Sequence, residues 1–314
     1  MAAAPESSTP EAPVDVSVVL PVYNEVGHLV EELDRIEAGL TAAGKTYELV
    51  VIDDGSSDGS SEILRARPGI RLLAFDSNRG SGSARRIGTA VSRGDVVVWT
   101  DVDMTYPNDK IAELVDAMAG HDHVVGARTT EEGTLKVLRT PAKWFIRQVA
   151  QVLAGRRIPD LNSGFRAFRR DVASQYLHLL PDGFSCVTTL TLSFLSNGYT
   201  VNYVDIPYAE RAGSSKFHWY RDTRKYLLQV VRMVLMFNPL KLIGPIATLL
   251  LLAGLGKLAY DVITDPWSVA INTVILLVAS ALLLGIGMVS DLLVQLTRPR
   301  RDVLPATTYS SPPR

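Results

Sequence analysis

Two long stretches near the C-terminal end of the chain carry no charged residue, and they limit its fold more than any other feature. They cover residues 242–256 and 268–290, and Lys241 and Lys257 bracket the first. A helix needs about 20 apolar residues to cross a bilayer, so the second stretch is long enough by itself. The first becomes long enough when its two lysines extend toward the lipid headgroups.

The two stretches predict a transmembrane hairpin over residues 239–296, with helices near 240–260 and 268–292. A helical hairpin buried in a soluble core is the alternative. It is the weaker one, because the two stretches follow each other directly at the end of the chain.

Charge around the hairpin predicts its orientation. Asp261 and Asp265 lie in its short loop, whereas basic residues flank it on both sides: Arg232, Lys241, Arg298, Arg300 and Arg301. The positive-inside rule places such flanks in the cytoplasm. We therefore expect a multi-pass protein of the cell membrane, with its large N-terminal domain and both termini cytoplasmic.

The segment before the hairpin, residues 217–238, has the pattern of an amphipathic helix. Arg221 and Lys225 share one face with Arg232, and apolar or aromatic side chains such as Trp219 lie opposite. Such a helix either lies in the membrane interface, with its cations toward anionic headgroups, or packs on the soluble domain. The sequence supports both.

Composition excludes some other classes. The chain has 314 residues and a formal net charge of -1, which gives no case for nucleic-acid binding. Cys186 is the single cysteine, in keeping with a reducing compartment. Residues 1–13 are rich in Ala, Pro, Ser and Glu, and we expect them and residues 297–314 to be disordered tails.

Residues 14–216 alternate between strand-like and helix-like runs. Apolar β-type runs fall at 16–20, 47–53, 70–75 and 95–101, and helical spacing falls at 26–43, 59–66 and 81–93. This alternation predicts an α/β domain with a mainly parallel sheet and helices on both faces. Ligands of such open sheets bind beyond the carboxyl ends of the strands.

Polar and acidic residues stand at the ends of three of these runs. The clusters are Pro21, Tyr23, Asn24 and Glu25, then Asp53 and Asp54, then Asp101, Val102 and Asp103. A tight turn with a helix cap accounts for one such cluster. Three clusters at successive strand ends indicate one ligand site at one edge of the sheet.

The ordered motifs VVLPVYNE, VVIDDGSSDGS, NRGSGSARRIGTAVSRGD and DVD resemble family 2 glycosyltransferases. The resemblance covers residues 16–216 and implies the nucleotide-diphospho-sugar-binding fold called GT-A. The run DLNSGFR at 160–166, Arg211, and the GSSK run that ends at Lys216 resemble the polyprenyl-phosphate glycosyltransferases more closely. Dolichol-phosphate mannose synthases belong to that group.

The acidic triplet suits a divalent cation. Breaking a sugar–phosphate bond adds charge to the pyrophosphate leaving group, and a Lewis acid stabilises that charge. Asp101 and Asp103 offer hard oxygen ligands, of the kind that Mg²⁺ or Mn²⁺ prefers. The related mannose synthases have an assisting Gln two residues further on, where this chain has Thr105. The third ligand therefore stays unassigned.

Other residues are expected to bind the nucleotide sugar. We expect Asp53 to accept a hydrogen bond from the base or ribose and Tyr23 to stack on the base, with a pocket wall shaped by Pro21, Asn24 and Glu25. Asp54 is instead a candidate for holding the loop. Arg85 and Arg86 either reach the pyrophosphate or lie exposed on a helix. By resemblance, Arg211 and Lys216 close over the pyrophosphate.

The acceptor decides the reaction. A lipid phosphate is already anionic near neutral pH and attacks the anomeric carbon without a general base, but it needs cations, and arginine pairs with two phosphate oxygens. Arg128 and Arg139 match by resemblance the acceptor-phosphate arginines of the mannose synthases, and Lys143 adds a cation where that family can have Ser.

The predicted activity is inverting transfer from a UDP- or GDP-linked sugar to a polyprenyl phosphate. The expected catalytic residues are Asp103, Arg128, Arg139 and Arg211. A homo-oligomer is compatible with this architecture.

Two alternatives stay open. A polysaccharide synthase glycosylates a hydroxyl and needs a general base, for which Asp160 and Asp182 are candidates. Such enzymes usually carry Q-x-x-R-W, whereas residues 229–233 read QVVRM. A catalytically silent nucleotide-sugar-binding membrane protein is the second alternative, and the intact acidic and basic sets argue against it.

Overall fold

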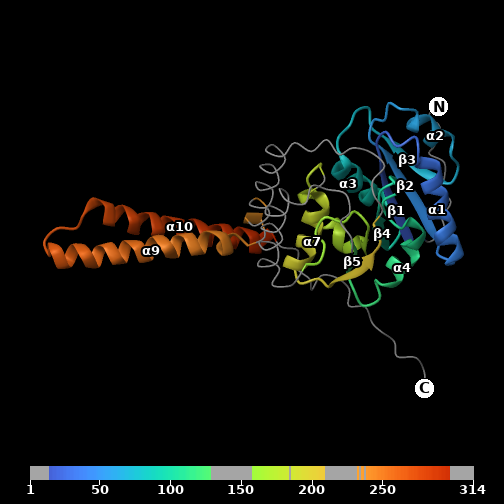
Figure 1. Cartoon of the computed structure of the whole chain (residues 1–314). Coiled ribbons are helices and arrows are strands. Elements are labelled where there is room, and N and C mark those ends of the chain that lie inside the picture. The colour runs from blue at the N-terminus through green and yellow to red at the C-terminus, as the bar shows by residue number, and fades with distance from the viewer. Residues whose placement is uncertain are drawn as a thin grey trace, which may run out of the picture. The chain divides into compact units, whose positions relative to one another are not determined.

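In a computed structural model the chain divides into two compact units, Met1–Met233 and Val234–Arg314 (Figure 1). The structure describes residues 14–128, 158–183, 185–208, 232, 235–236 and 238–297. Among these, the first unit holds a seven-stranded sheet with its helices, and the second holds two long helices. The predicted tails and most of the amphipathic segment 217–238 lie outside the described residues.

The sheet has the strand order β3-β2-β1-β4-β6-β5-β7. Neighbouring strands run parallel, except that β6 is antiparallel to both β4 and β5. The bounds are β1 Val16–Val22, β2 Tyr47–Asp53, β3 Ile70–Ala74, β4 Val96–Trp99, β5 His123–Arg128, β6 Arg166–Arg169 and β7 Val201–Ile206. The register pairs Val22 with Asp53 and Val19 with Trp99, so β1, β2 and β4 end at the same edge.

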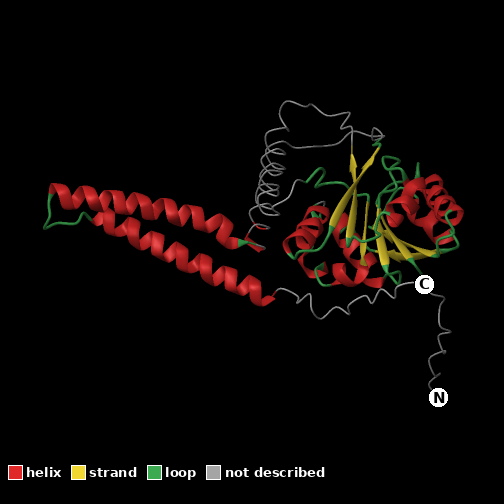
Figure 2. Ribbon diagram, turned by 90° about the horizontal axis from the view of Figure 1, so that it is seen from below, coloured by secondary structure: helices red, strands yellow, loops and turns green. Residues whose placement is uncertain are grey.

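Side chains of β1 alternate between two apolar layers, as expected for a strand that is covered on both faces. Val18 and Leu20 share a buried cluster with Leu33 of α1 (Leu29–Ala42). On the other face, Val19 lies so close to Gly88 of α3 (Ser81–Val91) that a side chain there would collide with it. Figure 2 shows helices on both sides of the strands.

Among the residues that the structure describes, the other helices of the first unit are α2 Ser60–Ala66, η1 Asn108–Lys110, α4 Ile111–Asp116, α6 Arg170–Ser174, η2 Leu177–Leu179 and α7 Cys186–Ser196. The predicted α/β sheet with helices on both faces is confirmed. The predicted run 47–53 is β2, and the other three predicted runs differ from β1, β3 and β4 only at their ends.

The second unit is a hairpin of α9 (Pro239–Thr264) and α10 (Ile271–Thr297), each long and apolar enough to cross a membrane. Leucines on both helices point outward, and Leu249 is 69% exposed. Between the helices, the Ser280 hydroxyl donates to the Ala247 carbonyl at 2.9 Å. An apolar exterior with internally paired polar groups is what a bilayer requires. The predicted hairpin is confirmed.

The loop end of the hairpin is held by Asp261. Its carboxylate accepts hydrogen bonds from Lys257, from the Thr273 hydroxyl at 2.5 Å and from the Ala270 backbone N–H at 3.1 Å. One acidic side chain therefore links the end of α9 to the start of α10.

Candidate active site

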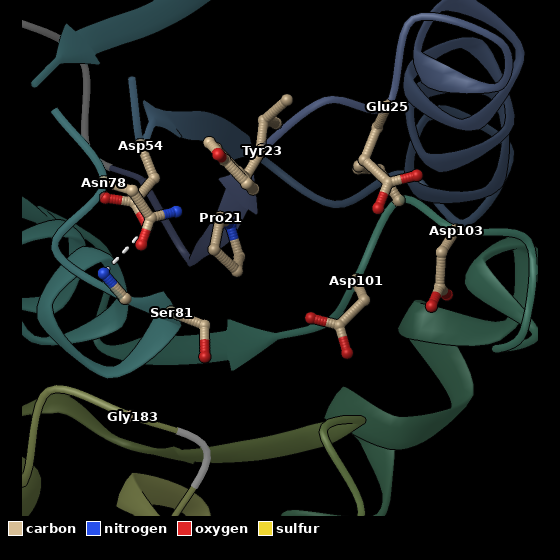
Figure 3. A pocket seen from close by; sticks show the side chains of 12 residues that line it. Pro21, Tyr23, Glu25, Asp54, Asn78, Ser81, Asp101, Asp103 and Gly183 are labelled. Carbon is tan, nitrogen blue, oxygen red and sulfur yellow. Dashed lines mark hydrogen bonds between the residues drawn. The ribbon is translucent and has the colours of Figure 1, made fainter. Parts of the chain in front are cut away.

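A pocket of about 330 Å³ opens at the carboxyl ends of β1, β2 and β4 (Figure 3). Six of the predicted donor-site residues line it: Pro21, Tyr23, Glu25, Asp101, Val102 and Asp103. Its other lining residues are Val22, Asp54, Asn78, Gly80, Ser81 and Gly183. The three polar clusters of the sequence therefore meet at one site, as predicted, and the start of α3 closes its side.

The wall after β1 is fastened to the loop after β2. The backbone N–H of Asn24 donates to the Ser56 hydroxyl at 3.1 Å, and the Asn24 side chain accepts from the Ser57 N–H at 2.8 Å. Asn24 has φ of 58°, a left-handed conformation that asparagine tolerates better than most residues. Asn24 thus shapes the wall without lining the pocket, while the neighbouring Tyr23 remains 47% exposed at the mouth.

The two aspartates at the end of β2 have different surroundings. Asp53 is buried behind the wall and accepts hydrogen bonds from the Ser56 N–H at 2.9 Å and from the Ser61 hydroxyl. Asp54 lines the pocket and accepts from the N–H groups of Arg79 at 2.7 Å and Gly80 at 2.9 Å. Asp54 therefore holds the loop before α3. Both carboxylate oxygens of Asp53 accept hydrogen bonds, one from the following turn and one from Ser61 in α2.

Arg85 lies beneath the acidic pair and is fully buried. Its Nη2 is 2.5 Å from Oδ1 of Asp101, and its guanidinium lies 5.7 Å from the centre of the Trp99 ring. Burial by itself would lower the pKa of Arg85, but the Asp101 carboxylate holds it above its ordinary value. The neighbouring Arg86 donates instead to the Leu180 carbonyl at 2.8 Å and to Asp182 at 2.9 Å.

Asp103 is oriented by a tight turn. The Thr105 hydroxyl donates to Oδ1 of Asp103 at 2.5 Å, its backbone N–H lies 3.3 Å from the same oxygen, and Met104 between them has φ of 62°. Backbone strain of this kind persists where the surroundings enforce it. The residue in place of the expected Gln therefore contacts the carboxylate.

A Mg²⁺ or Mn²⁺ ion fits the donor set of the pocket. The carboxylates of Asp101 and Asp103 both line it, and Mg²⁺ is commonly bound by one or two carboxylates together with substrate phosphates and water. Among the residues that the structure describes, no group of three His, Cys, Asp or Glu side chains could hold a metal by itself. The set thus suits an ion that arrives with a diphosphate.

A buried polar network that was not predicted from the sequence supports the acidic loop. The Asn108 amide donates to the Asp101 carbonyl at 2.9 Å and to the Glu32 carboxylate, and accepts from the Thr100 hydroxyl at 2.5 Å. Glu32 is fully buried, and burial raises its pKa despite its bonds to Asn108 and Arg35. In the sequence, the position of Glu32 on the apolar face of helix α1 is the feature that indicates a buried carboxylate.

Arg128 ends β5 and is bound by Asp160. Its Nε and Nη2 lie 2.6 and 3.0 Å from the two carboxylate oxygens, and its guanidinium is 5.1 Å from the centre of the Tyr208 ring. Burial by itself would lower the pKa of Arg128 and raise that of Asp160, but the pairing shifts both the other way. Arg139, Lys143, Arg211 and Lys216 lie outside the described residues.

The two candidate general bases are both engaged with arginines. Asp160 binds Arg128, and Asp182 accepts hydrogen bonds from Arg86 and from the Ser83 hydroxyl at 2.7 Å. These hydrogen bonds lower the pKa of Asp182, and the Arg128 pairing lowers that of Asp160 against the effect of burial. A carboxylate that is held in this way is a weak proton acceptor at neutral pH.

The fold agrees with a solved structure. Glucosyl-3-phosphoglycerate synthase from Mycobacterium tuberculosis, in complex with phosphoglyceric acid, superposes with a TM-score of 0.55 over 70% of this chain and 80% of that chain, at 19% identity. This likeness confirms the predicted GT-A type fold. The chain belongs to glycosyl transferase family 2, whose model matches residues 17–177. A second model, the GtrB C-terminal hairpin, matches residues 238–296.

Curated relatives share more of the sequence. The undecaprenyl-phosphate 4-deoxy-4-formamido-L-arabinose transferase of Edwardsiella ictaluri is 37% identical over 212 residues, which are 64% of this chain and 62% of that protein. The protein of the same name from Klebsiella pneumoniae is 32% identical over 249 residues, 76% of this chain and 73% of its own length. The match to the first relative thus spans less than two thirds of that protein.

Proposed function

We propose that this membrane-anchored glycosyltransferase moves a sugar from a nucleotide diphosphate to a polyprenyl phosphate, with inversion at the anomeric carbon. The observation that carries the proposal is the state of the candidate bases. Because Asp160 and Asp182 are both bound to arginines, an acceptor that is already anionic suits the site better than a hydroxyl. The names of the curated relatives, which are undecaprenyl-phosphate transferases, support the same acceptor.

For the donor, we propose a UDP- or GDP-linked sugar bound with Mg²⁺ or Mn²⁺. The structural neighbour glucosyl-3-phosphoglycerate synthase has been crystallised with Mn²⁺, UDP-glucose and phosphoglyceric acid, which makes UDP sugars the first donors to test. Tyr23 would stack on the base, with Pro21 and Glu25 beside it. The ion, held by Asp101 and Asp103, would neutralise charge on the leaving diphosphate.

The acceptor phosphate would supply the nucleophile. A phosphate monoester has a second pKa near ~6, so at pH 7 it is largely a dianion and no proton must be removed before attack. Arg128 would bind and orient it, and Arg139 and Lys143 would add positive charge. Arg211 and Lys216 would bind the leaving diphosphate. One direct displacement from the opposite face of the sugar inverts the anomeric configuration.

The hairpin would hold the catalytic domain at the bilayer where the lipid phosphate lies. Basic residues on its flanks favour a cytoplasmic catalytic domain, where nucleotide sugars are available.

A panel assay tests the proposal. The purified full chain is incubated with labelled UDP and GDP sugars, Mn²⁺ or Mg²⁺, and undecaprenyl phosphate, and the lipid extract is analysed by mass spectrometry. We expect one donor to give a polyprenyl-phosphate sugar. Binding of a nucleotide sugar without any transfer would favour the silent binding protein, and transfer to an added oligosaccharide would favour the polysaccharide synthase.

A further inference from the structure

We propose, building on the function proposed above, that Asp160 is a positioning residue. It fixes the guanidinium of Arg128 so that one edge of it is presented to the acceptor phosphate. Asp160 itself touches neither substrate nor metal in this arrangement.

Two side-chain hydrogen bonds and one backbone contact join Asp160 to Arg128. Oδ2 of Asp160 lies 2.6 Å from Nε of Arg128 and 3.3 Å from the Arg128 backbone nitrogen, and Oδ1 lies 3.0 Å from Nη2. The carboxylate is itself fixed, because Oδ1 also accepts from the Asn162 backbone N–H at 2.9 Å. Both side chains are mostly buried, at 15% and 11% exposure, so solvent screens the pairing little.

Aromatic rings hold the guanidinium as well. The Tyr208 ring centre is 5.1 Å from the Arg128 guanidinium, and Tyr208 packs edge-on against Tyr106 at 5.3 Å. Tyr106 in turn stacks on Phe165 at 5.8 Å. Arginine has five N–H donors in a planar fork, and Asp160 engages Nε and one side of Nη2. The fork between Nη1 and Nη2 is the edge that matches two phosphate oxygens.

The segment that follows Asp160, residues 161–164, extends toward Asp101 in the donor pocket. Gly164, four residues after Asp160, donates its N–H to the Tyr106 hydroxyl at 2.7 Å. A Cβ on Gly164 would lie 2.8 Å from Oδ2 of Asp101. Residues 160–164 therefore run from the acceptor cation to the immediate vicinity of Asp101. Fixing these two groups relative to each other is what a direct displacement needs, since small misplacement of reacting atoms slows such reactions strongly.

A positioning role for Asp160 and simple charge attraction by Arg128 predict opposite effects of the same substitution on acceptor binding. Asp160 cancels the charge of Arg128, so replacing it by asparagine makes the site more positive by one unit. If Arg128 attracted the phosphate by charge alone, Asp160→Asn would strengthen acceptor binding. If Asp160 positions Arg128, the same change weakens acceptor binding.

The experiment measures steady-state kinetics of the full chain in lipid nanodiscs, with undecaprenyl phosphate and the sugar nucleotide found by the panel assay. Asp160→Asn should raise KM for the lipid phosphate by about tenfold or more and leave KM for the donor within about twofold. Asp160→Glu keeps the charge but moves the carboxylate, and it should also raise the acceptor KM. The matched control is Asp171→Asn, which removes an exposed Asp–Arg pair with Arg169 at 2.8 and 3.2 Å.

Three results would overturn the proposal. An acceptor KM that is unchanged or lower in Asp160→Asn would favour charge attraction. A loss of kcat with both KM values unchanged, and with the acidic limb of the pH profile altered, would make Asp160 a general base. Equal rises of both KM values together with a lower Tm would make it only structural. If wild-type protein does not glycosylate the lipid phosphate at all, the proposed function has failed, and this is visible before any variant is compared.

Discussion

Replacing Thr105 by valine removes one hydroxyl and almost no volume. That hydroxyl donates to Oδ1 of Asp103 at 2.5 Å, from a residue that is 2% exposed. Valine keeps the shape of threonine, so the backbone around Met104 has no steric reason to move. The substitution therefore isolates the role of the hydroxyl in orienting the Asp103 carboxylate toward a bound cation.

The size of the effect follows from the contacts that remain. A hydrogen bond to a charged group contributes about 1.5–3 kcal/mol, and loss of a partner that orients a metal ligand typically weakens metal binding about 10–100-fold. The Thr105 backbone N–H still lies 3.3 Å from the same oxygen and retains part of the orientation. We therefore expect the lower end of the range, about tenfold, which equals ~1.4 kcal/mol.

The assay is calorimetric titration of Mn²⁺ into the purified full chain, alone and with UDP, so that binding is read without catalysis. Thr105→Ser retains the hydroxyl and should bind Mn²⁺ like wild type. Thr41→Val removes an exposed hydroxyl that contacts only Tyr47, at 3.2 Å, among the described residues, and it serves as a distant control. Wild-type affinity in Thr105→Val would refute the orienting role. Weak binding in Thr105→Ser would attribute the effect to the lost methyl group.

Two further predictions concern buried contacts. Gly164→Ala would place a Cβ 2.8 Å from Oδ2 of Asp101 and 3.2 Å from Arg85, so Mn²⁺ affinity and transfer should fall at least tenfold. Gly27→Ala, with open space around it, should behave like wild type. Equal Mn²⁺ affinities of the two variants would contradict this packing. His123 is fully buried, and burial holds its pKa well below the ordinary value. Because protonation of His123 favours the unfolded state, the free energy of unfolding should fall below about pH 6.5, by up to ~1.4 kcal/mol per pH unit. His123→Phe, next to Phe168 and Phe194, should flatten that dependence in thermal melts; identical pH profiles would contradict it.

Local patterns were enough to predict the frame of the catalytic domain. The apolar runs that became β1 to β4 are bounded by turn residues, and the polar clusters follow them directly, so the position of the pocket follows from strand direction alone. The uncharged stretches likewise predict α9 and α10, because bilayer thickness sets the length of a helix that crosses it.

Pairings between distant segments were not predictable in the same way. Arg128 and Asp160 are 32 residues apart and meet only because β6 runs antiparallel between β4 and β5, and β6 is too short to stand out as an apolar run. Asp53 and Asp54 bind different partners because their carboxylates point in different directions at the end of β2. From sequence Arg85 is either a pyrophosphate ligand or an exposed helix residue, yet it is buried against Asp101.

Transfer to a lipid phosphate is tested by comparing two acceptors that differ by one phosphate. The full chain, Mn²⁺ and the sugar donor found by the panel assay are incubated with undecaprenyl phosphate or with undecaprenol, and the products are analysed by mass spectrometry and by NMR of the anomeric centre. We predict a phosphodiester-linked sugar of inverted configuration from the phosphate and no product from the alcohol. Glycosylation of the alcohol, or retention of the donor's configuration, would contradict inverting transfer to a lipid phosphate.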